Sequence, residues 1–366
     1  MSLTTKAAVL TAPRTIEMRE LAVPEIDQNS GILRIEITGV CGVDWPAYTG
    51  ERPDRFKLPL ILGHEIVGRI VKLGAKAASR WNCQEGDRVV LEEYAPCGRC
   101  QYCLSGHYYL CGGMMMEKMY GFTSLNVAPG LWGGFSEYVY LDPNALIHKI
   151  SDKVPQTVAP LYIGLANAIR WVQGEGGIGV GDTVVILGPG QLGLACVIAA
   201  KEAGAACIIV TGRGRDRARM EIARKLGAHH TIDVDADQYV SDTVFDITGG
   251  KMADAVINVT SHFAGAAQQA VELAKIRGTV VMAGGAVAPA AGFQSDLLPR
   301  KEVTMKGVRG RTGRDIKKSI ALIESGRHAL HLLSTHKFTI EQAELALKAV
   351  GGEGPPDAVH VSVLNA

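Results

Sequence analysis

Residues 183–203, TVVILGPGQLGLACVIAAKEA, constrain the fold more strongly than any other stretch of the chain. The segment 183–187 is an apolar run rich in β-branched residues, which is typical of a buried strand. A glycine-rich turn follows directly, and the apolar run 191–203 after it predicts a helix. A strand, a tight glycine turn and a helix in this order indicate one unit of an alternating strand–helix sheet.

The alternation continues along the chain and predicts an α/β, doubly wound parallel sheet. Strands are expected at 207–211, 230–234, 255–259 and 279–282, and helices at 216–226 and 263–275. The first 150 residues differ, because short apolar or alternating runs between Gly and Pro predict an all-β, barrel-like domain. Those runs are 32–37, 66–73, 88–91 and 135–141. After about residue 295 the pattern is mixed again, with a helix expected at 314–325 and a final strand at 358–364.

The glycine turn after the strand matches the pattern G-x-G-x-x-G. In that pattern Gly188 makes the turn, Gly190 lets a pyrophosphate approach the backbone, and Gly193 lets the helix pack on the strand. Gln191 and Leu192 then lie at the helix N-terminus, where backbone N–H groups bind phosphate. Because a strand precedes the pattern and a helix follows it, we predict a dinucleotide-binding loop.

The end of the second strand indicates which dinucleotide binds. An acidic residue expected there would bind the ribose 2′-hydroxyl of NAD, but the position is Gly212, and Arg213 and Arg215 follow at once. Guanidinium groups beside a glycine suit a 2′-phosphate, because Arg offers several donors to phosphate oxygens. The sequence therefore predicts NADP in preference to NAD.

Four cysteines lie within fifteen residues, in PCGRCQYCLSGHYYLC. Cys97, Cys100, Cys103 and Cys111 have the spacing C-x2-C-x2-C-x7-C, which aims four thiolates at one centre. Zinc is the expected metal, and a [4Fe–4S] cluster is the alternative that also takes four cysteines. With four ligands and no open position, the metal is predicted to be structural.

Bulk properties exclude several classes of partner. The 366 residues carry a net charge of +1, which removes the electrostatic reason for binding nucleic acid or an acidic membrane surface. No stretch approaches the roughly 18 apolar residues of a membrane span, and the first twenty residues lack the apolar run of a signal peptide. We therefore predict a soluble, cytoplasmic protein.

The ordered set of motifs resembles the zinc-containing medium-chain alcohol dehydrogenase/reductase family over essentially the whole chain. The set comprises Cys41 with Asp44, then LGHEIVG (62–68), the four-cysteine lobe, GGFSEYV (133–139) and GPGQLG (188–193). The resemblance implies a GroES-like β-barrel catalytic domain and a Rossmann domain, with the active site in the cleft between them. The expected bounds are 1–155 for the catalytic domain with its lobe at about 92–112, 156–295 for the Rossmann domain, and 296–366 for a return to the catalytic domain.

The resemblance also implies the chemistry: hydride exchange at a catalytic zinc between a nicotinamide and an alcohol, aldehyde or ketone. It implies a homodimer or homotetramer. Carried over by motif, Cys41 and His64 are the first two zinc ligands, and Asp44 is the carboxylate that orients the histidine. Glu65 matches the acid beside the histidine that can approach the metal.

Three positions depart from the family pattern. Val43 and Pro46 stand where a hydroxyl residue and a histidine commonly relay the proton. The segment 156–170 contains no Cys, Asp or Glu to serve as the third ligand, and Tyr162 and Asn167 are its only substitutes. Zinc could instead be held by Cys41, His64 and Glu65, with the proton passing through water or a ribose hydroxyl. Two alternatives stay open: metal-free, NADPH-dependent reduction of an enone, and a non-catalytic dinucleotide-binding protein.

Overall fold

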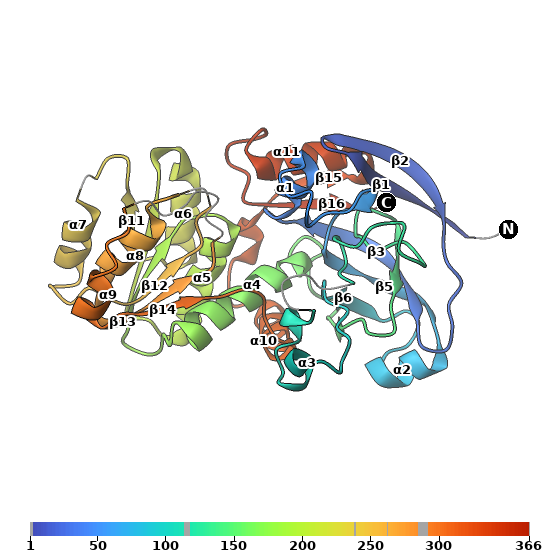
Figure 1. The fold of residues 1–366 in the computed structure, drawn as a ribbon, viewed down its shortest axis with the longest axis horizontal. Coiled ribbons are helices and arrows are strands. Elements are labelled where there is room, and N and C mark those ends of the chain that lie inside the picture. Colours follow the sequence, from blue (N-terminus) through green and yellow to red (C-terminus); the bar gives the residue numbers. More distant parts are fainter. Residues whose placement is uncertain (1–2, 113–117, 238, 262, 285–291, 366) are drawn as a thin grey trace. The chain divides into compact units, whose positions relative to one another are not determined.

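The computed structural model describes residues 3–112, 118–237, 239–261, 263–284 and 292–365. The chain divides into two compact units, one made of residues 1–163 and 312–366 and the other of residues 164–311. We call the first the barrel unit and the second the Rossmann unit. The ribbon colours show that the barrel unit combines the beginning and the end of the chain (Figure 1).

The Rossmann unit contains a six-stranded parallel sheet, which confirms the predicted doubly wound architecture. Its order is β11-β10-β9-β12-β13-β14, so the chain runs outward from β9 in one direction and then returns to build the other half. The strands are β9 Thr183–Leu187, β10 Cys207–Gly212, β11 His230–Asp233, β12 Ala253–Asn258, β13 Ala274–Met282 and β14 Thr304–Gly307. Buried aliphatic side chains from these strands form the core of this unit.

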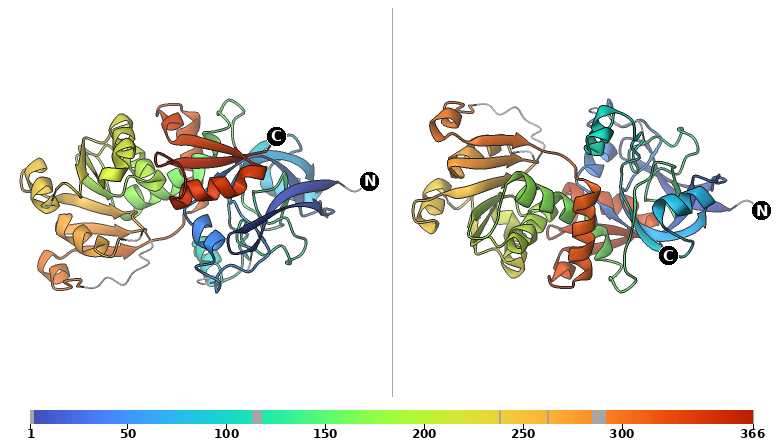
Figure 2. Two further views of the ribbon diagram at one scale, coloured as in Figure 1. Left: turned by 90° about the horizontal axis from the view of Figure 1, so that it is seen from above. Right: turned by 90° about the horizontal axis from the view of Figure 1, so that it is seen from below.

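Helices cover both faces of this sheet (Figure 2). They are α5 Gln191–Ala203, α6 Arg217–Leu226, α7 Val240–Ile247, α8 Ala266–Leu273 and α9 Leu297–Lys301. Helix α8 is shorter than the predicted helix 263–275, because Ala274 already pairs with Ala253 as the first residue of β13. Helix α4 (Tyr162–Ile169) and the π-helical turn Arg170–Glu175 precede β9 in the chain.

Residues 296–311 differ from expectation. The sequence predicts that the chain re-enters the barrel domain at residue 296. Instead, β14 forms the sixth strand of the Rossmann sheet, with Thr304 opposite Thr279 of β13. This short strand lies at the edge of the sheet and has no fully buried residue. It therefore lacks the apolar run that marks a central strand in a sequence.

The barrel unit is built from two sheets. The larger has the path β15-β16-β3-β5-β6-β8, with β7 paired to β3, and the smaller has the order β2-β1-β4. The strands are β1 Thr4–Ala12, β2 Thr15–Ala22, β3 Gly31–Val40, β4 Leu60–Ile61, β5 Glu65–Leu73, β6 Arg88–Leu91, β7 Tyr138–Leu141, β8 Ile147–Lys149, β15 Ser334–Thr339 and β16 His360–Leu364. Helices of this unit are α1 Asp44–Thr49, α2 Ala75–Trp81, α3 Gln101–Leu104, α10 Gly313–Glu324 and α11 Ala343–Gly351.

The last strand completes the large sheet next to one of the first. Strand β16 pairs antiparallel with β3, and β3 pairs antiparallel with β5 on its other side. Gly39 of β3 therefore lies opposite Ser362 on one side and opposite Glu65 on the other. This register brings the C-terminal segment beside the predicted metal site.

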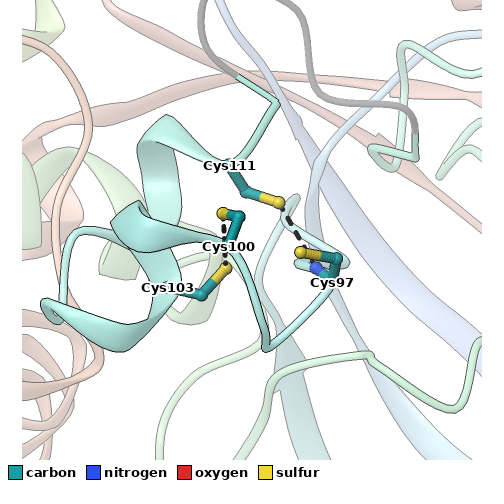
Figure 3. Close-up of side chains that lie close together, drawn as sticks. All are labelled: Cys97, Cys100, Cys103 and Cys111. Atoms are coloured by element: carbon teal, nitrogen blue, oxygen red, sulfur yellow. Dashed lines mark hydrogen bonds between the residues drawn. The ribbon is translucent and has the colours of Figure 1, made fainter.

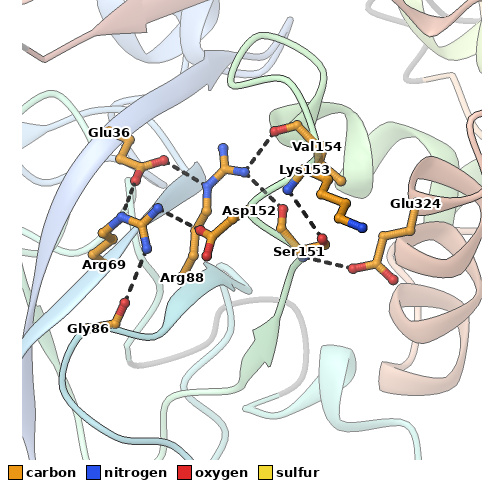
Figure 4. Close-up of polar contacts among 9 residues, drawn as sticks. All are labelled: Glu36, Arg69, Gly86, Arg88, Ser151, Asp152, Lys153, Val154 and Glu324. Atoms are coloured by element: carbon orange, nitrogen blue, oxygen red, sulfur yellow. Dashed lines mark hydrogen bonds and ion pairs between the residues drawn. The ribbon is translucent and has the colours of Figure 1, made fainter.

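A buried ion pair fastens the segment that leaves the first half of the barrel (Figure 4). Arg88 donates from Nε to Glu36 at 2.8 Å and from Nη1 to the carbonyls of Ser151 and Val154. The backbone N–H of Ser151 donates to Glu324 at the end of α10. Because the Arg88 side chain is almost fully buried, these acceptors compensate the cost of removing its charge from water.

No helix in the described part of the chain is both long and apolar enough to cross a membrane.

Candidate active site and structural metal centre

The barrel unit brings three predicted metal ligands together. One ligand atom each from Cys41, His64 and Glu65 lie within 4.8 Å of one another. Cys41 follows β3 directly and Glu65 opens β5, so the pairing of these two strands sets the spacing. His64 and Glu65 are buried, whereas Cys41 remains partly exposed.

Asp44 holds two of these residues. Its Oδ2 accepts from the backbone N–H of Cys41 at 2.9 Å, and its Oδ1 lies 3.4 Å from Nδ1 of His64. Both of the latter atoms are buried and form no hydrogen bond to another described group, so they face only each other. Burial is the largest single effect and lowers the pKa of His64, but Asp44 and Cys41 together raise it, and the resulting pKa is about 10. Nε2 of His64 is the nitrogen left to bind a metal.

Glu65 has a partner that the sequence interpretation did not include. Its Oε2 lies 2.9 Å from Nε2 of His360, and both side chains are about 1% to 2% exposed. A histidine six residues before the end of the chain has no motif around it, so its role could be found only through the pairing of β16 with β3. Phe122 also has no motif around it in the sequence, and its ring centre lies 4.8 Å from that of His64.

The donor set fits zinc. A thiolate, an imidazole and a carboxylate are all common zinc ligands, and three protein ligands with one open position are typical of catalytic sites. The buried, otherwise unpartnered Nδ1 of His64 facing Asp44 is the arrangement that orients a zinc-bound histidine. The site can therefore hold zinc without a fourth protein ligand.

The two substitute ligands considered for the segment 156–170 are engaged elsewhere. The hydroxyl of Tyr162 donates to the carbonyl of Leu91, and Oδ1 of Asn167 accepts from Nη1 of Arg311 at 3.3 Å. Glu65 is therefore the carboxylate that accompanies Cys41 and His64 among the described residues.

The aromatic residues of the segment 41–48, CGVDWPAY, pack into the barrel unit. Tyr48 is 1% exposed and donates to Oε1 of Glu344 at 2.8 Å; burial and this carboxylate raise the pKa of Tyr48 to about 12. The Trp45 ring lies against Gly351, where a Cβ would approach it to 2.2 Å. Trp45 and Tyr48 thus pack helix α1 onto α11.

The four cysteines of the lobe converge (Figure 3). Their sulfur atoms lie within 4.8 Å of one another, Sγ of Cys100 is 3.5 Å from that of Cys103, and none forms a disulfide. Thiolates bound to one zinc at about 2.3 Å would lie about 3.8 Å apart, so the cluster fits a tetrahedral zinc closely. The backbone N–H of Cys103 lowers the pKa of Cys100 to about 6, which favours the thiolate.

The glycine loop of the Rossmann unit adopts the expected turn between β9 and α5. Gly188 has φ +99°, a conformation that side chains rarely adopt, and a Cβ on Gly193 would lie 1.8 Å from the carbonyl oxygen of Gly188. Gly190 caps α5, and a Cβ there would meet no described atom within 4 Å. Gly188 and Gly193 are thus required by the fold, whereas Gly190 leaves open space at the helix N-terminus, where Gln191 and Leu192 follow.

An acidic residue, Asp235, pairs with one of the two arginines that are expected to bind the 2′-phosphate. Gly212 packs against Pro189, and Arg213 and Arg215 are exposed beside it. Nε of Arg213 donates to Oδ1 of Asp235 at 3.0 Å, and the N–H of Gly214 donates to the same carboxylate. Asp235 lies here because β11 runs parallel to β10 and both strands end at one edge.

Comparisons with known proteins place both halves of the chain. Residues 27–152 match the model of the alcohol dehydrogenase GroES-like domain, and residues 192–325 match that of the zinc-binding dehydrogenases. A Mycobacterium tuberculosis protein named "Probable alcohol dehydrogenase adh" is 37% identical over 351 residues, covering 95% of each chain. The erythritol/L-threitol dehydrogenase of Mycolicibacterium smegmatis is 30% identical, over 99% of this chain and 98% of that one.

Solved structures agree with the sequence comparisons. An alcohol dehydrogenase of Thermotoga maritima superposes with a TM-score of 0.88 at 28% identity, covering 99% of both chains. A protein of Sinorhizobium meliloti, solved bound to NADP, gives a TM-score of 0.85 at 25% identity, over 99% of this chain and 100% of that one. The chain is thus an oxidoreductase that belongs to the zinc-type medium-chain alcohol dehydrogenase family, with a GroES-like and a Rossmann domain.

Proposed function

We propose that the protein transfers hydride between NADP(H) and an alcohol, aldehyde or ketone, with a catalytic zinc held by Cys41, His64 and Glu65 and a structural zinc held by the four-cysteine lobe. The observation that carries the proposal is the convergence of these three side chains, one of each common zinc-ligand type, at the end of β3 and the start of β5. We also propose that the protein forms a homodimer or homotetramer, as the family resemblance implies.

NADP is proposed as the preferred cofactor on the strength of Arg213 and Arg215. Both are exposed beside Gly212, where an acid would otherwise contact the ribose. The Sinorhizobium meliloti relative of known structure was solved with NADP, which supports the same choice. Asp235 already occupies one side of the Arg213 guanidinium, so Arg215 carries more of the expected phosphate binding.

A zinc ion held by Cys41, His64 and Glu65 would act as a Lewis acid toward the substrate oxygen, and the nicotinamide would exchange the hydride. Asp44 fixes the orientation of His64 and of the Cys41 backbone. The Phe122 ring lies beside His64, with the two ring centres 4.8 Å apart. Val43 and Pro46 provide neither donor nor acceptor in their side chains, so neither can relay the alcohol proton.

The test is a panel of small alcohols, aldehydes and ketones assayed by NADPH formation or consumption, with an enone included. We expect turnover of alcohols and carbonyls by the wild type, and a loss of about 100-fold or more in Cys41→Ser with NADPH binding unchanged. Cys83→Ser is the matched control, since Cys83 is buried away from both cysteine sites. Turnover of the enone alone, unaffected by Cys41→Ser, would contradict the proposal and favour the metal-free reductase.

A further inference from the structure

His360 forms a buried pair with Glu65 across 295 residues of sequence. Its Nε2 lies 2.9 Å from Oε2 of Glu65, and its Nδ1 lies 3.5 Å from the hydroxyl of Ser362. A hydroxyl that donates to Nδ1 leaves the hydrogen of the neutral imidazole on Nε2, which then donates to the carboxylate. One oxygen of Glu65 is thereby committed to the histidine.

Gly39 makes this contact possible. Strand β3 lies between β5 and β16, so the Glu65 side chain must cross β3 to reach His360. A Cβ on Gly39 would lie 2.0 Å from Oε2 of Glu65 and 2.8 Å from Nε2 of His360. The backbone of Gly39 has no positive φ, so its own conformation does not require glycine. Glycine is needed at position 39 because a side chain there would occupy the space through which the Glu65 carboxylate reaches His360.

We infer that His360 is a positioning residue for the metal site: it holds Oε2 of Glu65 and so fixes the carboxylate beside Cys41 and His64. The inference rests on the proposed catalytic zinc and adds its outer support. A hydrogen bond from a buried histidine restricts the orientation of a buried carboxylate and offsets part of the cost of burying it. The C-terminal strand thus contributes to a metal site whose ligands all lie in the first 65 residues.

The inference predicts a site-specific loss of metal affinity. His360→Leu removes the hydrogen bond from His360 to Glu65, and outer-shell losses of this kind weaken metal binding by about 10- to 100-fold. His360→Gln keeps an N–H donor and is expected to restore part of the affinity. Gly39→Ala blocks the passage and is expected to resemble His360→Leu, although no hydrogen-bonding group has been changed.

The measurement is zinc transfer from the purified full-length protein to a chromophoric chelator. The zinc released from the Cys41 site is identified as the portion missing in Cys41→Ser. The matched control is His148→Gln, because His148 forms a similar pair with Glu92 in the same unit, at 2.7 Å, and touches none of the three ligands. His148→Gln should leave the affinity of the Cys41 site unchanged, and Glu65→Ala should make His360→Leu silent, because His360 acts only through Glu65.

Two outcomes overturn the inference. One is a wild-type affinity in His360→Leu while the wild type holds zinc at Cys41. The other is a further loss of affinity when His360→Leu is added to Glu65→Ala, which would show that His360 acts by another route. A wild type with no zinc released from the Cys41 site instead overturns the proposed function itself, and this inference with it.

Discussion

Two kinds of residue determine how far function could be predicted. Residues embedded in a local pattern were identified from sequence: the four lobe cysteines do converge, and Cys41 and His64 do meet with Glu65 beside them. Residues that act through strand pairing were not. His360 and Asp235 reach their partners only because β16 lies beside β3 and β11 lies beside β10, and no local pattern encodes those neighbours.

Arg213 and Arg215 carry a prediction at this scale. The double variant R213A/R215A is expected to weaken NADPH binding by about 10- to 100-fold, since it removes charge-assisted hydrogen bonds to the 2′-phosphate. NADH binding should change little, because that phosphate is absent. Dissociation constants for both cofactors, measured by fluorescence titration, check this. Arg217→Ala, an exposed arginine at the start of α6, is the control. An equal loss for NADH would contradict the assignment.

At the scale of elements, apolar runs predicted the central strands and helices well. Strand β9 and helix α5 have the predicted bounds, because strong periodicity and a glycine turn fix both ends. The hairpin of β1 and β2 and the edge strand β14 were missed or misplaced. Strands β2 and β14 have no fully buried residue, and the continuous buried run of β1 is only Ala7–Leu10, so their hydrophobic signal is weak.

The glycine loop makes a paired prediction at this scale. Gly193→Ala is expected to destabilise the Rossmann unit by about 1–3 kcal/mol, because the new Cβ overlaps the Gly188 carbonyl and forces β9 and α5 apart. Gly190→Ala should leave stability nearly unchanged but weaken binding of either cofactor, since its Cβ enters the space at the helix N-terminus. Chemical denaturation and cofactor titration separate the two effects. Equal destabilisation by both variants would contradict the division between fold and binding roles.

At the scale of the whole molecule, the family resemblance predicted features of the fold that hydrophobic periodicity could not. The all-β character of the first 150 residues and the alternation after residue 183 predicted two architectures correctly. That the chain's last segment re-enters the first sheet followed from the family alone, because β16 is a short apolar strand that could pair anywhere. The comparisons then established the family over the length of the chain.

We propose that the barrel unit holds two zinc ions, one structural and one catalytic. The most direct measurement is the zinc content per chain, determined on the native protein by mass spectrometry and elemental analysis. We expect two zinc ions in the wild type, one in Cys41→Ser, and one in Cys103→Ser with a lower melting temperature, because structural zinc contributes to folding. One zinc in the wild type, retained in Cys41→Ser, would contradict the account, and iron in the lobe would contradict its assignment as a zinc site.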